Sequence, residues 1–73
     1  MYLKDIAEII AERTGCDPER VKPESSFTEL GIDSLDTVEM VMSLEDRLDM
    51  ELELDRPVRT VGELIAFIAE KAS

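Results

Sequence analysis

Apolar side chains near the start of the chain recur at helical spacing. The residues at i, i+3, i+4 and i+7 are Leu3, Ile6, Ala7 and Ile10. Gly15 follows them as a C-terminal cap, and from residue 16 to 32 the period is lost among prolines, serines and a glycine. We therefore expect a first helix that ends near Gly15, followed by a long loop. Phe27 and Leu30 are the apolar residues that we expect to anchor this loop.

A second helical pattern begins at Asp33 or Ser34, both good N-cap residues, and runs to about Leu48 without glycine or proline. Its apolar residues cover an arc of roughly 220°, which is wider than one core-facing stripe requires. The narrow opposite face holds Asp36, Glu39, Ser43, Asp46 and Arg47. At the edges of the apolar arc, Leu35 and Met42 are expected to lie exposed or to line something other than the core.

The remaining third of the chain contains one ambiguous segment and one clear helix. Residues 49–59 alternate charged and apolar side chains and break at Pro57, which leaves open a strand-like connection or a single helical turn. Thr60 and Glu63 have the spacing of a capping box. The helical period that follows comprises Val61, Leu64, Ile65, Ile68 and Ala72. The patterns predict a single all-α domain over 1–73: a small antiparallel bundle of three main helices, with a short third helix before the last one left open.

Length and charge narrow the function. With 73 residues, the chain is too short to enclose a deep active site. Its formal net charge of -10 repels nucleic acids and anionic membranes, so partners are expected to be basic proteins. Added salt should stabilise the fold by screening this charge.

Several kinds of chemistry find no support in the sequence. Histidine is absent, and no acidic segment has calcium-loop spacing, so no metal site is predicted. Cys16 is the only cysteine and has no activating base, which favours a small packing residue. The N-terminus lacks the apolar core of a secretion signal, and no apolar run is long enough to cross a bilayer. We expect a cytoplasmic protein that does not insert into membranes.

The stretch from residue 30 to 39 reads Leu-Gly-Ile-Asp-Ser-Leu-Asp-Thr-Val-Glu and places Ser34 at the start of the second helix. Taken alone, a serine there is usually an N-cap that contributes about 1 kcal/mol. The fuller pattern is more specific, because six of its letters would recur by chance on the order of once in tens of millions of positions.

This stretch resembles the attachment site of the acyl carrier proteins of dissociated fatty acid and polyketide synthases, and the resemblance spans nearly the whole chain. It implies that Ser34 receives 4′-phosphopantetheine from coenzyme A and that the thiol of this arm holds acyl groups as thioesters. The chain would then be a non-catalytic carrier and the substrate of a phosphopantetheinyl transferase. Asp33, the residue before the serine, would help to hold magnesium during that transfer.

The resemblance also implies a docking surface on the second helix for basic surfaces of the transferase, acyltransferases and ketosynthases. Its residues would be Asp33, Leu35, Asp36, Glu39, Met42, Glu45 and Asp46. Charge steering of this kind speeds encounter and leaves affinity modest, as suits a shuttle, which we expect to be a monomer.

An acyl chain would be held inside the bundle, which shields it from water at about 0.8 kcal/mol per methylene. The residues assigned to this pocket are Phe27, Val38, Val41, Leu44, Leu52, Leu54, Ile65 and Ile68. Apart from Phe27, the helical and alternating patterns on their own favour core positions for these residues.

The resemblance weakens after the second helix, where the connection is about two residues shorter than in typical carriers and Arg56-Pro57-Val58-Arg59 replaces acidic residues. This puts the family's short third helix in doubt. A peptidyl or aminoacyl carrier of nonribosomal synthesis is the first alternative, although such carriers typically lack the dense acidic face. The second is an unmodified acidic adaptor, in which Ser34 is only a cap.

Overall fold

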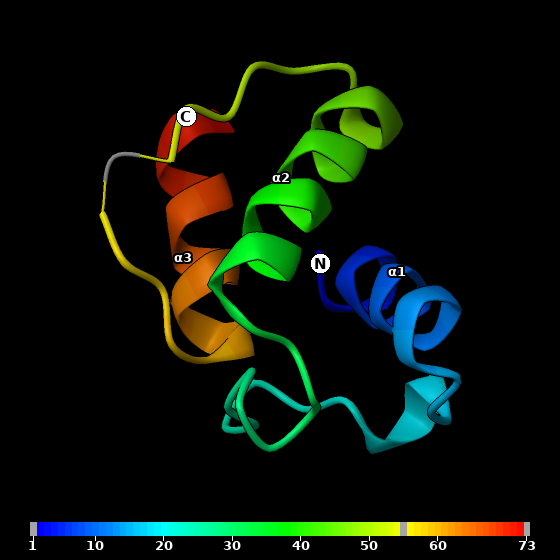
Figure 1. Ribbon diagram of the computed structural model, residues 1–73. Helices are drawn as coiled ribbons and strands as arrows, with labels where there is room; N and C mark the ends of the chain where they lie inside the picture. Colours follow the sequence, from blue (N-terminus) through cyan, green and yellow to red (C-terminus); the bar gives the residue numbers. More distant parts are fainter. Residues whose placement is uncertain (1, 55, 73) are drawn as a thin grey trace.

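The computed structural model describes residues 2–54 and 56–72, and these residues form three α-helices and one short 3₁₀ helix (Figure 1). The elements are α1 (Leu3–Thr14), η1 (Pro18–Arg20), α2 (Ser34–Leu48) and α3 (Val61–Ala72). No strand occurs in the described ranges, where the one β-type pairing is an isolated bridge between Ser26 and Thr60. The predicted all-α class is confirmed.

The helix ends lie where the capping residues predict them. Gly15 adopts the left-handed conformation with φ of 77°, and its N–H donates to Ala11 O at 2.8 Å, which closes α1. At the start of α3, Thr60 Oγ1 accepts from the Glu63 N–H at 3.2 Å, while Glu63 Oε2 accepts from the Thr60 N–H at 3.0 Å. This reciprocal pair is the predicted capping box. Asp49 ends α2 in a left-handed conformation, which the sequence had not indicated.

The long loop between α1 and α2 is anchored by its own apolar residues and by the backbone before and at the start of α3. Phe27 is buried, as predicted, and its N–H donates to Arg59 O at 3.0 Å. Gly62 N–H donates to Pro23 O at 2.8 Å, and a Cβ at Gly62 would lie only 3.0 Å from that oxygen. Glycine thus permits the loop and the first turn of α3 to approach closely. The 3₁₀ turn η1 inside the loop was not predicted.

In its described residues, the segment between α2 and α3 is an irregular connection with neither a helix nor a strand. In Figure 1 it leaves the end of α2 at the top of the view and returns to the bottom, where α3 begins. Its described residues, 49–54 and 56–60, contain no helix, so the short third helix is not formed there. Leu52 is buried, whereas its neighbours Glu51 and Glu53 are exposed. This alternation follows the period of two of an extended chain.

The core gathers apolar residues from all three helices and both connections. Its fully buried large side chains are Phe67, Ile6, Ile10, Met40, Leu44, Leu52, Leu64, Ile68 and Val61. Leu30 and Cys16 are half-buried and pack against this cluster. Cys16 therefore has the packing role that the sequence suggested. Among the described residues, no helix is long and apolar enough to cross a membrane.

Candidate functional site

The turn before α2 holds Ser34 at the surface. Gly31 has a φ of 78°, a conformation that favours glycine, and Ile32 is buried with its N–H donating to Phe27 O at 2.8 Å. This anchor places Ser34 at the first position of α2 and exposed. Within residues 2–54 and 56–72, no hydrogen bond engages the Ser34 hydroxyl.

Asp33, and not Ser34, caps α2. The Asp36 N–H donates to Asp33 Oδ1 at 2.9 Å, and the Asp33 N–H donates to Asp36 Oδ2 at 3.3 Å, so the two carboxylates form a reciprocal capping box. The nearly buried Thr37 hydroxyl donates to Asp33 O at 2.9 Å and reinforces the same turn. The reading of Ser34 as a simple cap is therefore wrong. Its hydroxyl is left available, beside the partial positive charge of the helix start.

The acidic face of α2 is engaged by α1 near Ser34. The exposed Arg13, in the last turn of α1, donates through Nη2 to Asp36 Oδ1 at 2.9 Å and to Glu39 Oε2 at 2.8 Å. The pKa of Asp36 lies below its ordinary value, first because Arg13 donates to its carboxylate and next because the Asp33 N–H does. Hydrogen bonding to Asp36 correspondingly raises the pKa of Arg13. No pattern in the sequence around Arg13 indicates this pairing.

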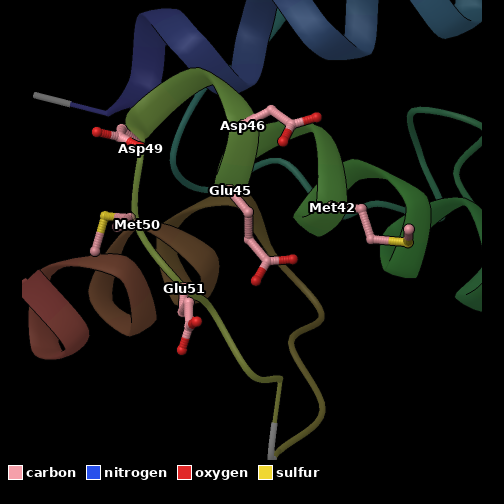
Figure 2. Close-up of a pocket in the computed structure, with 6 residues that line it drawn as sticks. All are labelled: Met42, Glu45, Asp46, Asp49, Met50 and Glu51. Atoms are coloured by element: carbon pink, nitrogen blue, oxygen red, sulfur yellow. The ribbon is translucent and has the colours of Figure 1, made fainter.

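The far end of α2 has a different environment. Glu45 is half-buried and accepts from the Leu52 N–H at 2.9 Å, so this carboxylate also fixes the connection that follows. Asp46 is exposed. A surface hollow of about 420 Å³ lies here, and Figure 2 shows its side chains coming from the last turns of α2 and the segment after it. Its lining residues are Met42, Glu45, Asp46, Asp49, Met50 and Glu51.

Three large apolar side chains of α2 are exposed. Leu35 and Met42 are 70% and 59% exposed, which confirms the prediction that the edges of the apolar arc lie outside the core. Val38 is 49% exposed, so its assignment to the core is wrong. Val38 lies one turn after Ser34, on the part of the arc that the rest of the bundle does not cover.

Val38 instead lines a groove beside Ser34 with a volume of about 730 Å³. The lining residues are Ser26, Phe27, Thr28, Ile32, Asp33, Ser34, Thr37, Val38, Leu54, Pro57, Val58 and Arg59. Of the residues assigned to an acyl pocket, the groove contains Phe27, Val38 and Leu54. Of the others, Ile65 is half-buried, and the buried ones are Val41, Leu44, Leu52 and Ile68.

Residues that the sequence analysis did not assign to this groove include Ile32, Pro57 and Val58. The sequence gives little indication of them, because Pro57 and Val58 are more than twenty residues away from Ser34 along the chain. They come close to the start of α2 only when the chain is folded. Among the described residues, no group of three or more acidic, cysteine or histidine side chains is placed to hold a metal ion.

Among the described residues, the start of α2 thus combines an exposed serine without a hydrogen-bond partner, a groove beside it and an acidic helix face. The family model for the phosphopantetheine attachment site matches residues 4–68. The acyl carrier protein of Streptococcus thermophilus (strain CNRZ 1066) is 42% identical over 66 residues, which cover 90% of this chain and 89% of that protein. The acyl carrier protein of Streptococcus pneumoniae serotype 4 (strain ATCC BAA-334 / TIGR4) is 39% identical over 67 residues, covering 92% and 90%.

The chain belongs to the phosphopantetheine-binding family of acyl carrier proteins. Its prosthetic group is 4′-phosphopantetheine, and the surroundings of Ser34 fit such a group. The hydroxyl is exposed, and the groove beside it is large enough for an apolar chain.

Proposed function

We propose that Ser34 is the attachment point of 4′-phosphopantetheine and that the whole chain, 1–73, is one non-catalytic carrier domain. The observation that carries this proposal is that Asp33 and Ser34 have separate roles at the start of α2. Asp33 caps the helix, and the Ser34 hydroxyl is exposed and unengaged among the described residues. When bound, the arm supplies a terminal thiol that holds acyl groups as thioesters.

The groove beside Ser34 is the proposed entrance for the acyl chain. Its apolar lining includes Phe27, Val38 and Leu54, and the side chains assigned deeper in the bundle are Val41, Leu44, Leu52, Ile65 and Ile68. Each methylene moved from water into such surroundings contributes about 0.8 kcal/mol. Because the deeper residues already pack closely in the core, a long chain has to separate α2 from its neighbours.

The proposed partners are a phosphopantetheinyl transferase, acyltransferases, ketosynthases and other biosynthetic enzymes with basic surfaces. The docking surface would be the side of α2 that carries acidic residues next to exposed apolar ones: Asp33, Leu35, Asp36, Glu39, Met42, Glu45 and Asp46. Opposite charges raise the association rate, and a small apolar contact keeps the complex short-lived. We propose that the carrier acts as a cytoplasmic monomer.

Incubation with coenzyme A and a broad-specificity phosphopantetheinyl transferase tests this function. Intact-mass measurement should show a gain of one phosphopantetheinyl group on the wild-type protein and none on Ser34→Ala. Ser43→Ala is the matched control, because Ser43 is also an exposed serine of α2, and this variant should be modified as the wild type is. An unmodified wild-type protein would support the acidic adaptor instead.

A further inference from the structure

Two arginines link α1 to α2, one at each end of the contact between these helices. Arg13 donates to Asp36 and Glu39 near Ser34, as described above. At the other end, Arg47 of α2 donates to Asp5 at 2.9 Å and to Glu8. Each arginine thus pairs with two carboxylates, but only Arg13 engages residues of the proposed docking surface.

Arg13 divides the acidic face of α2 into two electrostatically different halves. The carboxylates of Asp36 and Glu39, close to the attachment serine, share a cation that belongs to the chain itself. Within residues 2–54 and 56–72, no ion pair engages Asp46 or Asp49 at the far end. The negative potential close to Ser34 is therefore weaker than the number of acidic residues suggests.

We propose that Arg13 is an internal competitor for the basic residues of partner proteins. Resting on the proposed function, this inference deepens it: a partner cation that bridges Asp36 and Glu39 as Arg13 does competes with Arg13 for the same oxygens. The partner chemistry that fits is a guanidinium, because a single arginine can donate to both carboxylates as Arg13 does. Arg13 would thus lower the affinity of basic partner proteins for the end of α2 that carries Ser34.

The ion pairs of Arg13 are suited to exchange. The side chains of Arg13, Asp36 and Glu39 are 30%, 32% and 50% exposed, so water can replace each contact as it breaks. Exposed pairs of this kind add little to stability. Arg47 continues to link α1 to α2 when Arg13 moves away. A partner can therefore open the Arg13 contact without unfolding the bundle.

The experiment compares Arg13→Gln with Arg47→Gln as substrates of a basic-surfaced phosphopantetheinyl transferase, using the full chain. Both variants remove one positive charge and two ion pairs between α1 and α2, so they are matched in net charge and in lost contacts. We expect Arg13→Gln to lower KM about two- to threefold at low salt with kcat unchanged. Arg47→Gln should lower KM less than Arg13→Gln does, because Arg47 pairs with Asp5 and Glu8, which lie outside the proposed docking surface.

The salt dependence of KM distinguishes electrostatic competition by Arg13 from a structural effect of its substitution. The advantage of Arg13→Gln should vanish near 1 M salt, where the Debye length is about 3 Å. Equal KM values for all three proteins, an equal decrease in both variants, or a higher KM for Arg13→Gln would each overturn the proposal. Normal modification of the wild type in those cases would leave the carrier function standing, whereas a wild type that is never modified would remove both.

Discussion

Asp33 and Ser34 have separate roles at the start of α2. The Asp33 carboxylate accepts the Asp36 N–H and caps the helix, while Ser34 occupies the first helical position with its hydroxyl exposed. The capping contacts do not use the Ser34 hydroxyl, so the proposed modification would leave their donor and acceptor atoms in place.

Substitution of these neighbours should have unequal effects on stability. We expect Asp33→Ala to lower the free energy of unfolding by about 1 kcal/mol, because it removes the N-cap, and Ser34→Ala to change it by only a few tenths. Urea unfolding followed by circular dichroism measures both, and Asp33→Asn, which retains a capping oxygen, is the control. A larger loss for Ser34→Ala than for Asp33→Ala would contradict the capping assignment.

The lowered pKa of Asp36 makes one contribution to stability depend on pH. Arg13 and the Asp33 N–H favour the ionised carboxylate in the folded state. The contribution is complete above the unfolded-state pKa of about 4 and is lost as pH falls through the lower folded-state pKa. The difference in unfolding free energy between wild type and Asp36→Asn should be constant from about pH 7 to 5 and shrink below about pH 4. A difference that grows on acidification would show that the pKa is raised instead.

At the residue scale, the local sequence indicates Ser34 as a candidate site residue but does not indicate the ion pairs that Arg13 makes with Asp36 and Glu39. The letters around Ser34 are contiguous, so their pattern is visible without a structure. Arg13 is 23 residues from Asp36 and 26 from Glu39, and nothing in its own surroundings marks it as their partner. Such a pairing depends on how α1 lies against α2, which only the folded chain defines.

At the scale of the element, α2 shows which structural features the hydrophobic period of a helix predicts and which it does not. The helix bounds followed from the capping residues and the lack of glycine and proline, and the width of the apolar arc correctly indicated exposed apolar residues. Periodicity alone does not say which residues of a wide arc meet the core. The period therefore predicts a core position for Val38, whereas Val38 lines a surface groove.

Substitution of two valines of α2 distinguishes a core position from a groove position by the loss of stability that each causes. Val41 is 4% exposed, so Val41→Ala should lower the free energy of unfolding by about 2 kcal/mol through a lost contact and a cavity. Val38→Ala should cost less than about 1 kcal/mol, because Val38 is already half exposed. Thermal and urea unfolding of both variants check this. Equal losses would mean that Val38 belongs to the core after all.

The sequence does not define the conformation of the connection between α2 and α3, because alternating charged and apolar residues fit both an extended chain and a short amphipathic turn. The structure resolves it through contacts that are distant in sequence. Glu45 holds the Leu52 N–H, and Phe27 N–H holds the Arg59 carbonyl, so both ends of the connection are fixed by other segments. Of these residues, Phe27 and Arg59 line the groove beside Ser34.

At the scale of the whole molecule, the charge of -10 is the dominant electrostatic feature. This net charge already counts Arg13 and Arg47, and most carboxylates lie at the surface. Like charges on a small surface repel one another and destabilise the compact state. Composition alone was enough to predict this, since it does not depend on the arrangement of the helices.

Salt should therefore raise the melting temperature. Raising sodium chloride from about 10 mM to 150 mM shortens the Debye length from about 30 Å to 8 Å, which screens the repulsion. We expect an increase in Tm of several degrees, because a change of 1 kcal/mol shifts a domain of this size by about 4–8 °C. Differential scanning calorimetry measures it, and a Tm that falls with salt would mean that attractive ion pairs outweigh the net repulsion.

The most direct test of the proposed carrier function is to locate the residue to which the prosthetic group is attached. After incubation with coenzyme A and a phosphopantetheinyl transferase, tandem mass spectrometry of the digested protein locates the modified residue. We expect the phosphopantetheinyl group on the peptide that contains Ser34, and on that serine. A group on Ser25, Ser26 or Ser43, or no group at all, would contradict the account.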